Sequence, residues 1–233
     1  QFPEVMKYID GLNRLMTEGI RDVNTLIIAP TDSIAANYLN DYEKSSYSVN
    51  MSCEYRMLLE NLLDLQLDCE LGDETVIASH GFVRDGAFCI GNSSYQQVFV
   101  SETSTLREST VKLLSLFAEA GGTVIYVTEK PKLIDLKPGV MPSGIIVQNR
   151  KALLEKLVRH LKITRSAMIY DLGSDHLKPG AILHVRKLEH GKRIHIWSGA
   201  DFKPGQSIVS VPIETPENYC AYLIDPVDGK RRC

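Results

Sequence analysis

Two kinds of apolar spacing alternate along the first part of the chain. Apolar residues recur every three or four positions over 3–18 and again over 51–65, which predicts two amphipathic helices. Between them, 23–29 is a nearly continuous apolar run that ends at Pro30, as is typical of a strand buried on both faces of a sheet. We expect the first helix to pack on a core, and the polar stretch 31–50 to be a long connection with a short helix.

A strand–helix–strand unit is the clearest pattern further along. Residues 97–100 predict a strand, 105–120 a helix that stops at Gly121-Gly122, and 123–127 a second strand. Three such elements within about 30 residues predict a right-handed crossover between parallel strands.

Shorter signals surround this unit. The spacing predicts a strand at 67–71, a short helix after Asp73, a hairpin over 81–90 that turns at Asp85-Gly86, and a helix at 151–161. At the start of the 105–120 helix, a cap is expected from Thr103 or Ser104, with a capping box between Thr105 and Glu108.

The pattern changes after residue 164, where helical spacing ends. Residues 182–188 and 193–197 predict an antiparallel hairpin, and 208–213 and 219–224 are further strand candidates. We therefore divide the chain into two parts. Residues 1–163 are an α/β domain with a doubly wound, mostly parallel sheet, and residues 164–233 are a β-rich segment that begins a β-sandwich.

Composition excludes two broad classes of function. The chain has 26 Lys and Arg against 29 Asp and Glu, a net charge of −3, so it carries no general basic surface for nucleic acid. No apolar stretch approaches the roughly 20 residues that span a bilayer. Its five cysteines form no C-x-x-C pair, so we expect no metal site, and we interpret Cys69 and Cys89 as packing residues.

The first residues suggest a piece of a longer protein. The chain starts at Gln1 without an initiator Met and without a signal sequence. We expect an excised segment, and a mature protein whose leader was removed is the alternative. The compartment stays open between periplasmic or secreted and cytoplasmic.

No complete catalytic motif is present, and no motif points to a cofactor. Ligands of open α/β sheets bind at the carboxyl ends of the strands, which makes Asp32, Glu102 and Glu129 candidate binding residues at one rim. Glu102 and Glu129 could form a carboxylate pair as in glycoside hydrolysis, or they are simply solvated. Trp197 could stack on a sugar ring, or it is a core residue.

Two histidines belong to opposite arms of the predicted hairpin. His184 and His195 are expected to face each other, which suggests either a metal or acid/base pair or an ordinary polar cross-strand pair. We favour the polar cross-strand pair.

The order of several segments is similar to that of a known domain family. The strand 95–100, Leu113-Leu114, and the run from Phe117 through Gly121-Gly122 to Ile125 resemble glutamine-amidotransferase-like domains inside large glycoside hydrolases, such as β-galactosidases and α-L-rhamnosidase-like enzymes. The resemblance covers about 3–229. It implies a flavodoxin-like fold and the remaining domains of a parent enzyme as partners.

The same resemblance argues against catalysis by this segment. In true class I amidotransferases a nucleophilic Cys follows the strand after the Gly-Gly turn, whereas here Val127 is followed by Thr128. We therefore expect a non-catalytic ancillary segment of a glycoside hydrolase that supports the catalytic barrel or an oligomer contact. The alternatives are a stand-alone α/β hydrolase that uses the rim carboxylates, and a carbohydrate-binding module that uses Trp197.

Overall fold

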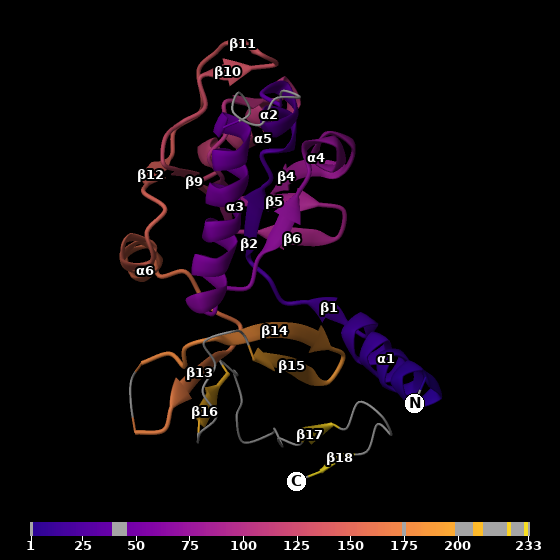
Figure 1. Cartoon of the computed structure of the whole chain (residues 1–233). Coiled ribbons are helices and arrows are strands. Elements are labelled where there is room, and N and C mark those ends of the chain that lie inside the picture. The colour runs from indigo at the N-terminus through magenta and orange to yellow at the C-terminus, as the bar shows by residue number, and fades with distance from the viewer. Residues whose placement is uncertain are drawn as a thin grey trace.

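A five-stranded parallel sheet forms the centre of the first part of the molecule (Figure 1). The computed structural model describes residues 2–38, 46–173, 176–198, 207–211, 223–224 and 231–232. The sheet has the order β12-β9-β7-β2-β3, and every neighbouring pair is parallel. Its strands are β2 (Thr25–Ile28), β3 (Glu70–Gly72), β7 (Gln97–Val100), β9 (Thr123–Val127) and β12 (Ile145–Val147). The expected α/β class with a parallel sheet is confirmed.

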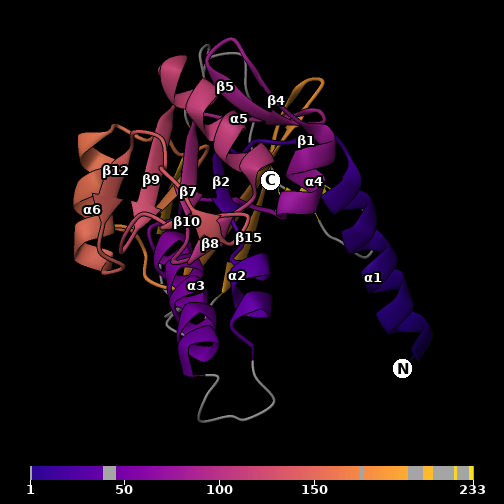
Figure 2. The ribbon, with the colours of Figure 1, turned by 90° about the horizontal axis from the view of Figure 1, so that it is seen from above.

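Helices cover both faces of this sheet (Figure 2). On one face, Ile27 and its neighbours pack against α3 (Ser46–Asp64) and α6 (Lys151–His160). On the other face, Leu26 and its neighbours pack against α4 (Glu74–His80) and α5 (Glu108–Glu119). Successive strand residues point to opposite faces, so the continuous apolar run of β2 supplies both cores.

The predicted crossover is confirmed, but the start of its helix is not where the capping pattern placed it. β7 and β9 are parallel neighbours joined by α5. α5 begins at Glu108, and its N-cap residue Arg107 makes no side-chain capping hydrogen bond, so the predicted capping residues were wrong. Instead, the backbone N–H of Arg107 donates to Oε2 of Glu74, 2.7 Å away. A carboxylate from another helix thus satisfies one of the free N–H groups there.

Small antiparallel pieces surround the sheet. The predicted hairpin is present as β4 (Gly81–Arg84) and β5 (Ala87–Ile90), extended by β6 (Ser93–Tyr95). Its turn residues Asp85 and Gly86 have φ of 52° and 75°, as a type I′ turn requires. At the carboxyl ends of the parallel strands lie α2 (Thr31–Ala36) and a sheet of β8 (Thr105–Leu106), β10 (Leu133–Ile134) and β11 (Lys137–Pro138).

The C-terminal part is antiparallel and lies at the amino ends of the parallel strands (Figure 1). The predicted hairpin is confirmed as β14 (Ala181–Leu188) and β15 (Gly191–Ser198), and β1 (Ile20–Arg21) pairs with β14. β13 (Met168–Asp171) pairs with β16 (Ser207–Ser210), and β17 (Leu223–Ile224) with β18 (Arg231–Arg232). The predicted strand 208–213 is partly described, as is 219–224. The β-sandwich and the boundary at 163/164 stay predictions.

The first helix, α1 (Phe2–Thr17), has the predicted range but not the predicted packing. It projects away from the body (Figures 1 and 2), and Gly11 is its one buried residue. Only its last turn is firmly attached, because Arg186 donates to the carbonyl oxygens of Thr17, Glu18 and Gly19 at 2.6–3.2 Å. Several large apolar side chains are therefore exposed: Phe2, Val5, Met6, Tyr8 and Ile9. The expectation that this helix lies on a core was wrong.

Candidate functional site

The strand order changes direction between β2 and β7, and open α/β sheets bind ligands outside the carboxyl ends of the strands at such a point. Here buried hydroxyl groups fill that position. Ser33 Oγ accepts from the N–H groups of Ser104 and Thr105 at 3.1 and 3.0 Å, and contacts Thr103 Oγ1. Ser101 Oγ donates to the carbonyl oxygen of Ile28, 2.8 Å away. The chain therefore fills this crevice with its own side chains.

Asp32 lies at this rim as predicted, but it is held by an arginine. Arg107 donates from Nε and Nη2 to the two carboxylate oxygens of Asp32, at 2.6 and 3.1 Å. The backbone of the same arginine is bound by Glu74, whose pKa is raised above the usual value, mainly because its carboxyl group is buried. These contacts join α2, α4 and the start of α5. The carboxylate of Asp32 is therefore used in an ion pair within the fold.

Glu102 and Glu129 lie near enough to each other at the rim for their charges to interact. Burial raises the pKa of Glu102, and the negative charges of Glu54 and Glu129 raise it further. Asn50 donates to Glu102 Oε1 from 3.4 Å, and the pKa of Tyr47 is raised by burial and then by the charges of the two glutamates. Glu129 forms an ion pair with Lys132 at 3.2 Å. The group is a partly exposed acidic cluster.

Thr128, between β9 and Glu129, has a backbone conformation that is rare for a β-branched residue. Its φ is 71°, and its N–H donates to the carbonyl oxygen of Val147, 2.8 Å away. Its side chain hydrogen-bonds to Glu102. The sharp turn is thus present after the strand, and the residue on it is a threonine next to a carboxylate.

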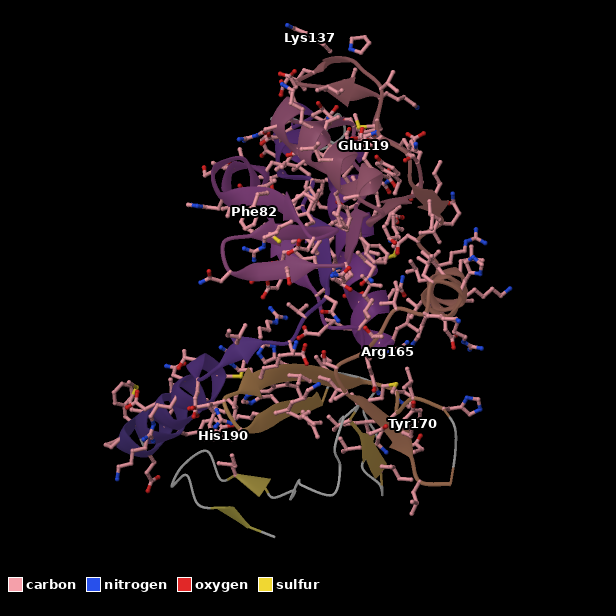
Figure 3. The ribbon with its side chains drawn as sticks, turned by 180° about the vertical axis from the view of Figure 1, so that it is seen from behind. Phe82, Glu119, Lys137, Arg165, Tyr170 and His190 are labelled. Carbon is pink, nitrogen blue, oxygen red and sulfur yellow. The ribbon has the colours of Figure 1, made fainter. Side chains whose placement is uncertain are left out.

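Trp197 is far from the three carboxylates. It lies on β15, at the opposite end of the sheet from β10 and β11, and is 39% exposed. In Figure 3, Lys137 of β11 and His190 of the β14–β15 turn mark these two ends. The predicted binding residues therefore do not form one site.

Two surface hollows lie elsewhere on the α/β part. One of 380 Å³ is lined by residues of β12 and α6, among them Ile146, Leu153 and Leu157. The other, of 180 Å³, includes Gly122 and Gly144. Neither is lined by any of the four predicted binding residues. In the part of the chain that the structure describes, no three His, Cys, Asp or Glu side chains are grouped to hold a metal ion. No described helix is long and apolar enough to span a membrane.

A second polar cluster, which the sequence did not predict, joins the α/β part to the β14–β15 hairpin. Arg21 binds both carboxylate oxygens of Asp68, and His184 Nδ1 lies 3.4 Å from Asp68 Oδ2. Burial alone would raise the pKa of Asp68, but the bonds from His184 and Arg21 more than offset it, and the pKa is lowered. Arg165 also lies at this junction (Figure 3) and donates to the carbonyl oxygen of Leu65, 2.7 Å away. We call this group the junction cluster.

The lowered pKa of His195, which lies opposite His184, leads to a prediction of how the free energy of unfolding depends on pH. Burial lowers its pKa from 6.5 to about 4, with further lowering by His184, Arg193 and Arg186. Between these values the unfolded chain binds a proton that the folded chain does not, so stability is lost as the pH falls. In this range the free energy of unfolding changes by at most about 1.4 kcal/mol per pH unit, and partial exposure of the ring makes the change smaller. Urea denaturation at pH 4.5–7.5 measures the slope, which should flatten in His195→Gln; an unchanged slope contradicts the prediction.

Comparison with known proteins gives distant structural likenesses, among them the following two. No protein-family model matches the chain, and no curated protein matches it. It is similar to the apo exo-carrageenase GH42 from Bacteroides ovatus, with a TM-score of 0.43 and 14% identity over 81% of this chain. It is also similar to the rhamnosidase from Novosphingobium sp. PP1Y, with a TM-score of 0.40 and 8% identity over 56% of this chain. Both are glycoside hydrolases, and the chain spans 28% and 14% of their lengths.

Proposed function

We propose that this chain is a non-catalytic ancillary segment of a larger carbohydrate-active glycoside hydrolase. In this proposal its α/β part is a degenerate relative of the amidotransferase-like domains that the segments 95–100 and 113–125 resemble. Its partners are the remaining domains of the parent enzyme, which it supports mechanically.

The observation that carries the proposal is the filled crevice between β2 and β7. A doubly wound sheet that acts on a ligand leaves this position open. Here Ser33, Ser101 and Thr103 are buried there, and their hydroxyl groups are used in hydrogen bonds to one another and to the backbone. Opening the crevice would leave these groups without partners, at a cost of about 1–3 kcal/mol each.

The turn after β9 supports the same proposal. A nucleophile at this position needs a neighbouring base, most often a histidine. Thr128 has instead the carboxyl group of Glu102 as its side-chain partner. His184 and His195 belong to the hairpin at the other end of the sheet. Thr128 is therefore paired with a carboxyl group and not with the histidine that most often activates a hydroxyl nucleophile.

The test is hydrolysis of a panel of 4-nitrophenyl glycosides by the purified 233-residue chain. We expect the wild type, Glu102→Gln and Glu129→Gln all to release nitrophenol at the rate of the buffer blank. The matched control is Glu119→Gln, which changes an exposed carboxylate at the end of α5 (Figure 3).

Turnover by the wild type that is lost in Glu102→Gln or Glu129→Gln, but kept in Glu119→Gln, would overturn the proposal in favour of a stand-alone hydrolase. The fluorescence of Trp197, the single tryptophan, measures glycan binding by the same samples. Saturable quenching without turnover would favour a carbohydrate-binding module.

A further inference from the structure

His184 and His195 form a close pair on one face of the β14–β15 hairpin. The register of the two strands places them directly opposite each other. Their ring centroids are 5.7 Å apart, and the ring planes are inclined by 53°. Neither residue contributes to the rim at the carboxyl ends of the parallel strands.

Each of these rings has one nitrogen engaged and one without a partner. His184 Nδ1 faces Asp68 Oδ2 at 3.4 Å. His195 has the backbone of Leu15 as its neighbour and hydrogen-bond partner. The Nε2 atoms of both histidines are buried and have no hydrogen-bond partner in the structure. The contact with Asp68 favours the tautomer of His184 that leaves its Nε2 lone pair free.

We infer that His184 and His195 are the two protein ligands of a site for a divalent transition-metal ion, of the class Zn²⁺, Ni²⁺ or Cu²⁺. Neutral imidazole is a preferred ligand of these ions. An ion about 2.0–2.1 Å from Nε2 lies about 3 Å from the ring centre, so two rings that share it have centres at most about 6 Å apart. The observed 5.7 Å meets this limit.

The surroundings of the pair resemble the outer shell of known metal sites. Histidines that bind metals donate their other N–H to a carboxylate or a backbone carbonyl, which fixes the ring and makes Nε2 a better ligand. Asp68 takes this role for His184, and the backbone of Leu15 takes it for His195.

Charges around the pair determine how tightly an ion is held. Arg186 and Arg193 on the same hairpin face oppose a cation, although Arg193 is neutralised in part by Glu18 at 2.6 Å. From the α/β side, Asp68 attracts a cation and Arg21 opposes it. With two ligands and these arginines, the ion is expected to exchange freely.

The experiment measures the melting temperature of the full chain in EDTA and in increasing Zn²⁺ or Ni²⁺. We expect a rise of about 5 °C or more at a hundredfold excess over Kd, which continues with the logarithm of the ion concentration. The rise should be lost in His184→Gln and in His195→Gln. It should persist in the control His190→Gln, whose side chain is 89% exposed in the adjacent turn.

A second measurement does not depend on how well these variants fold. Isothermal titration of Cu²⁺ into the wild type should give one ion per chain, and electron paramagnetic resonance should show two coordinated nitrogens. Asp68→Asn keeps both ligands, and in samples that circular dichroism shows to be folded it should weaken binding about 10–100-fold. The inference is overturned if the wild type binds none of the three ions, or if His190→Gln removes as much binding as the two ligand variants do.

Discussion

Replacing Phe117 by alanine is expected to lower the free energy of unfolding by about 3–5 kcal/mol, the range for a large aromatic side chain removed from a core. Phe117 is fully buried on α5 and meets Phe88 edge to face, with ring centroids 5.7 Å apart. Its ring also fills the space beside Gly122, where a Cβ would lie 2.1 Å from it. The ring of Phe117 thus packs closely against the backbone turn before β9. We expect the surrounding residues to move only slightly into the cavity that the alanine variant leaves.

Urea denaturation followed by circular dichroism measures this loss. Phe82→Ala is the matched control, because Phe82 on β4 is 36% exposed and its ring packs against Arg84 (Figure 3). We expect the control to cost less than about 1 kcal/mol. Equal losses in the two variants would contradict the place of Phe117 in the main core.

The second large effect is expected from Asp68→Asn, which removes the central charge of the junction cluster. Removal of one partner of a buried ion pair costs about 3–5 kcal/mol because the other charge stays buried. Asp68 is 13% exposed and Arg21 29%, so we expect a smaller loss, about 2–3 kcal/mol. The change should also loosen the hairpin, and hydrogen exchange of the β14 amides should therefore accelerate more than that of β7.

Asp64→Asn provides the comparison for this variant. Asp64 pairs with Lys151 at 2.7 Å, but the two side chains are 37% and 49% exposed. An exposed pair contributes about 0–1 kcal/mol. If Asp68→Asn destabilises the chain no more than Asp64→Asn does, the junction cluster is not what holds the two parts together.

Short-range spacing was sufficient to predict most of the α/β part. Gly-Gly after a periodic helix indicated the end of α5, and Asp85-Gly86 indicated the β4–β5 turn; the structure has both. β12 was not predicted, because three residues that follow a proline- and glycine-rich stretch carry too little periodicity to be noticed. The periodicity of α1 revealed an apolar stripe but contained no information on what covers it.

Long-range partners account for what the sequence could not predict at the candidate sites. That Asp32 and Glu102 reach one rim follows from the rule for strand ends. That Arg107 binds Asp32 does not, because 75 positions separate them. The junction cluster left one weak signal, the alternation of residues 67–71, which placed Asp68 within a predicted strand. Only the assembled sheet brings Asp68 to His184, and the choice between a solvated and a paired carboxylate depends on that geometry.

The pairing of β1 with β14 has a consequence for how the chain is made. Ile20 lies opposite Lys187, and Asp22 donates through its backbone to Val185. A ribosome adds about 5–20 residues per second, so β1 waits on the order of 10–30 s for the strand it pairs with. During that interval the parallel sheet can form, but the junction cluster cannot. The N-terminal segment therefore spends its first seconds as an unpaired edge, the stage of synthesis at which a chaperone would protect it most.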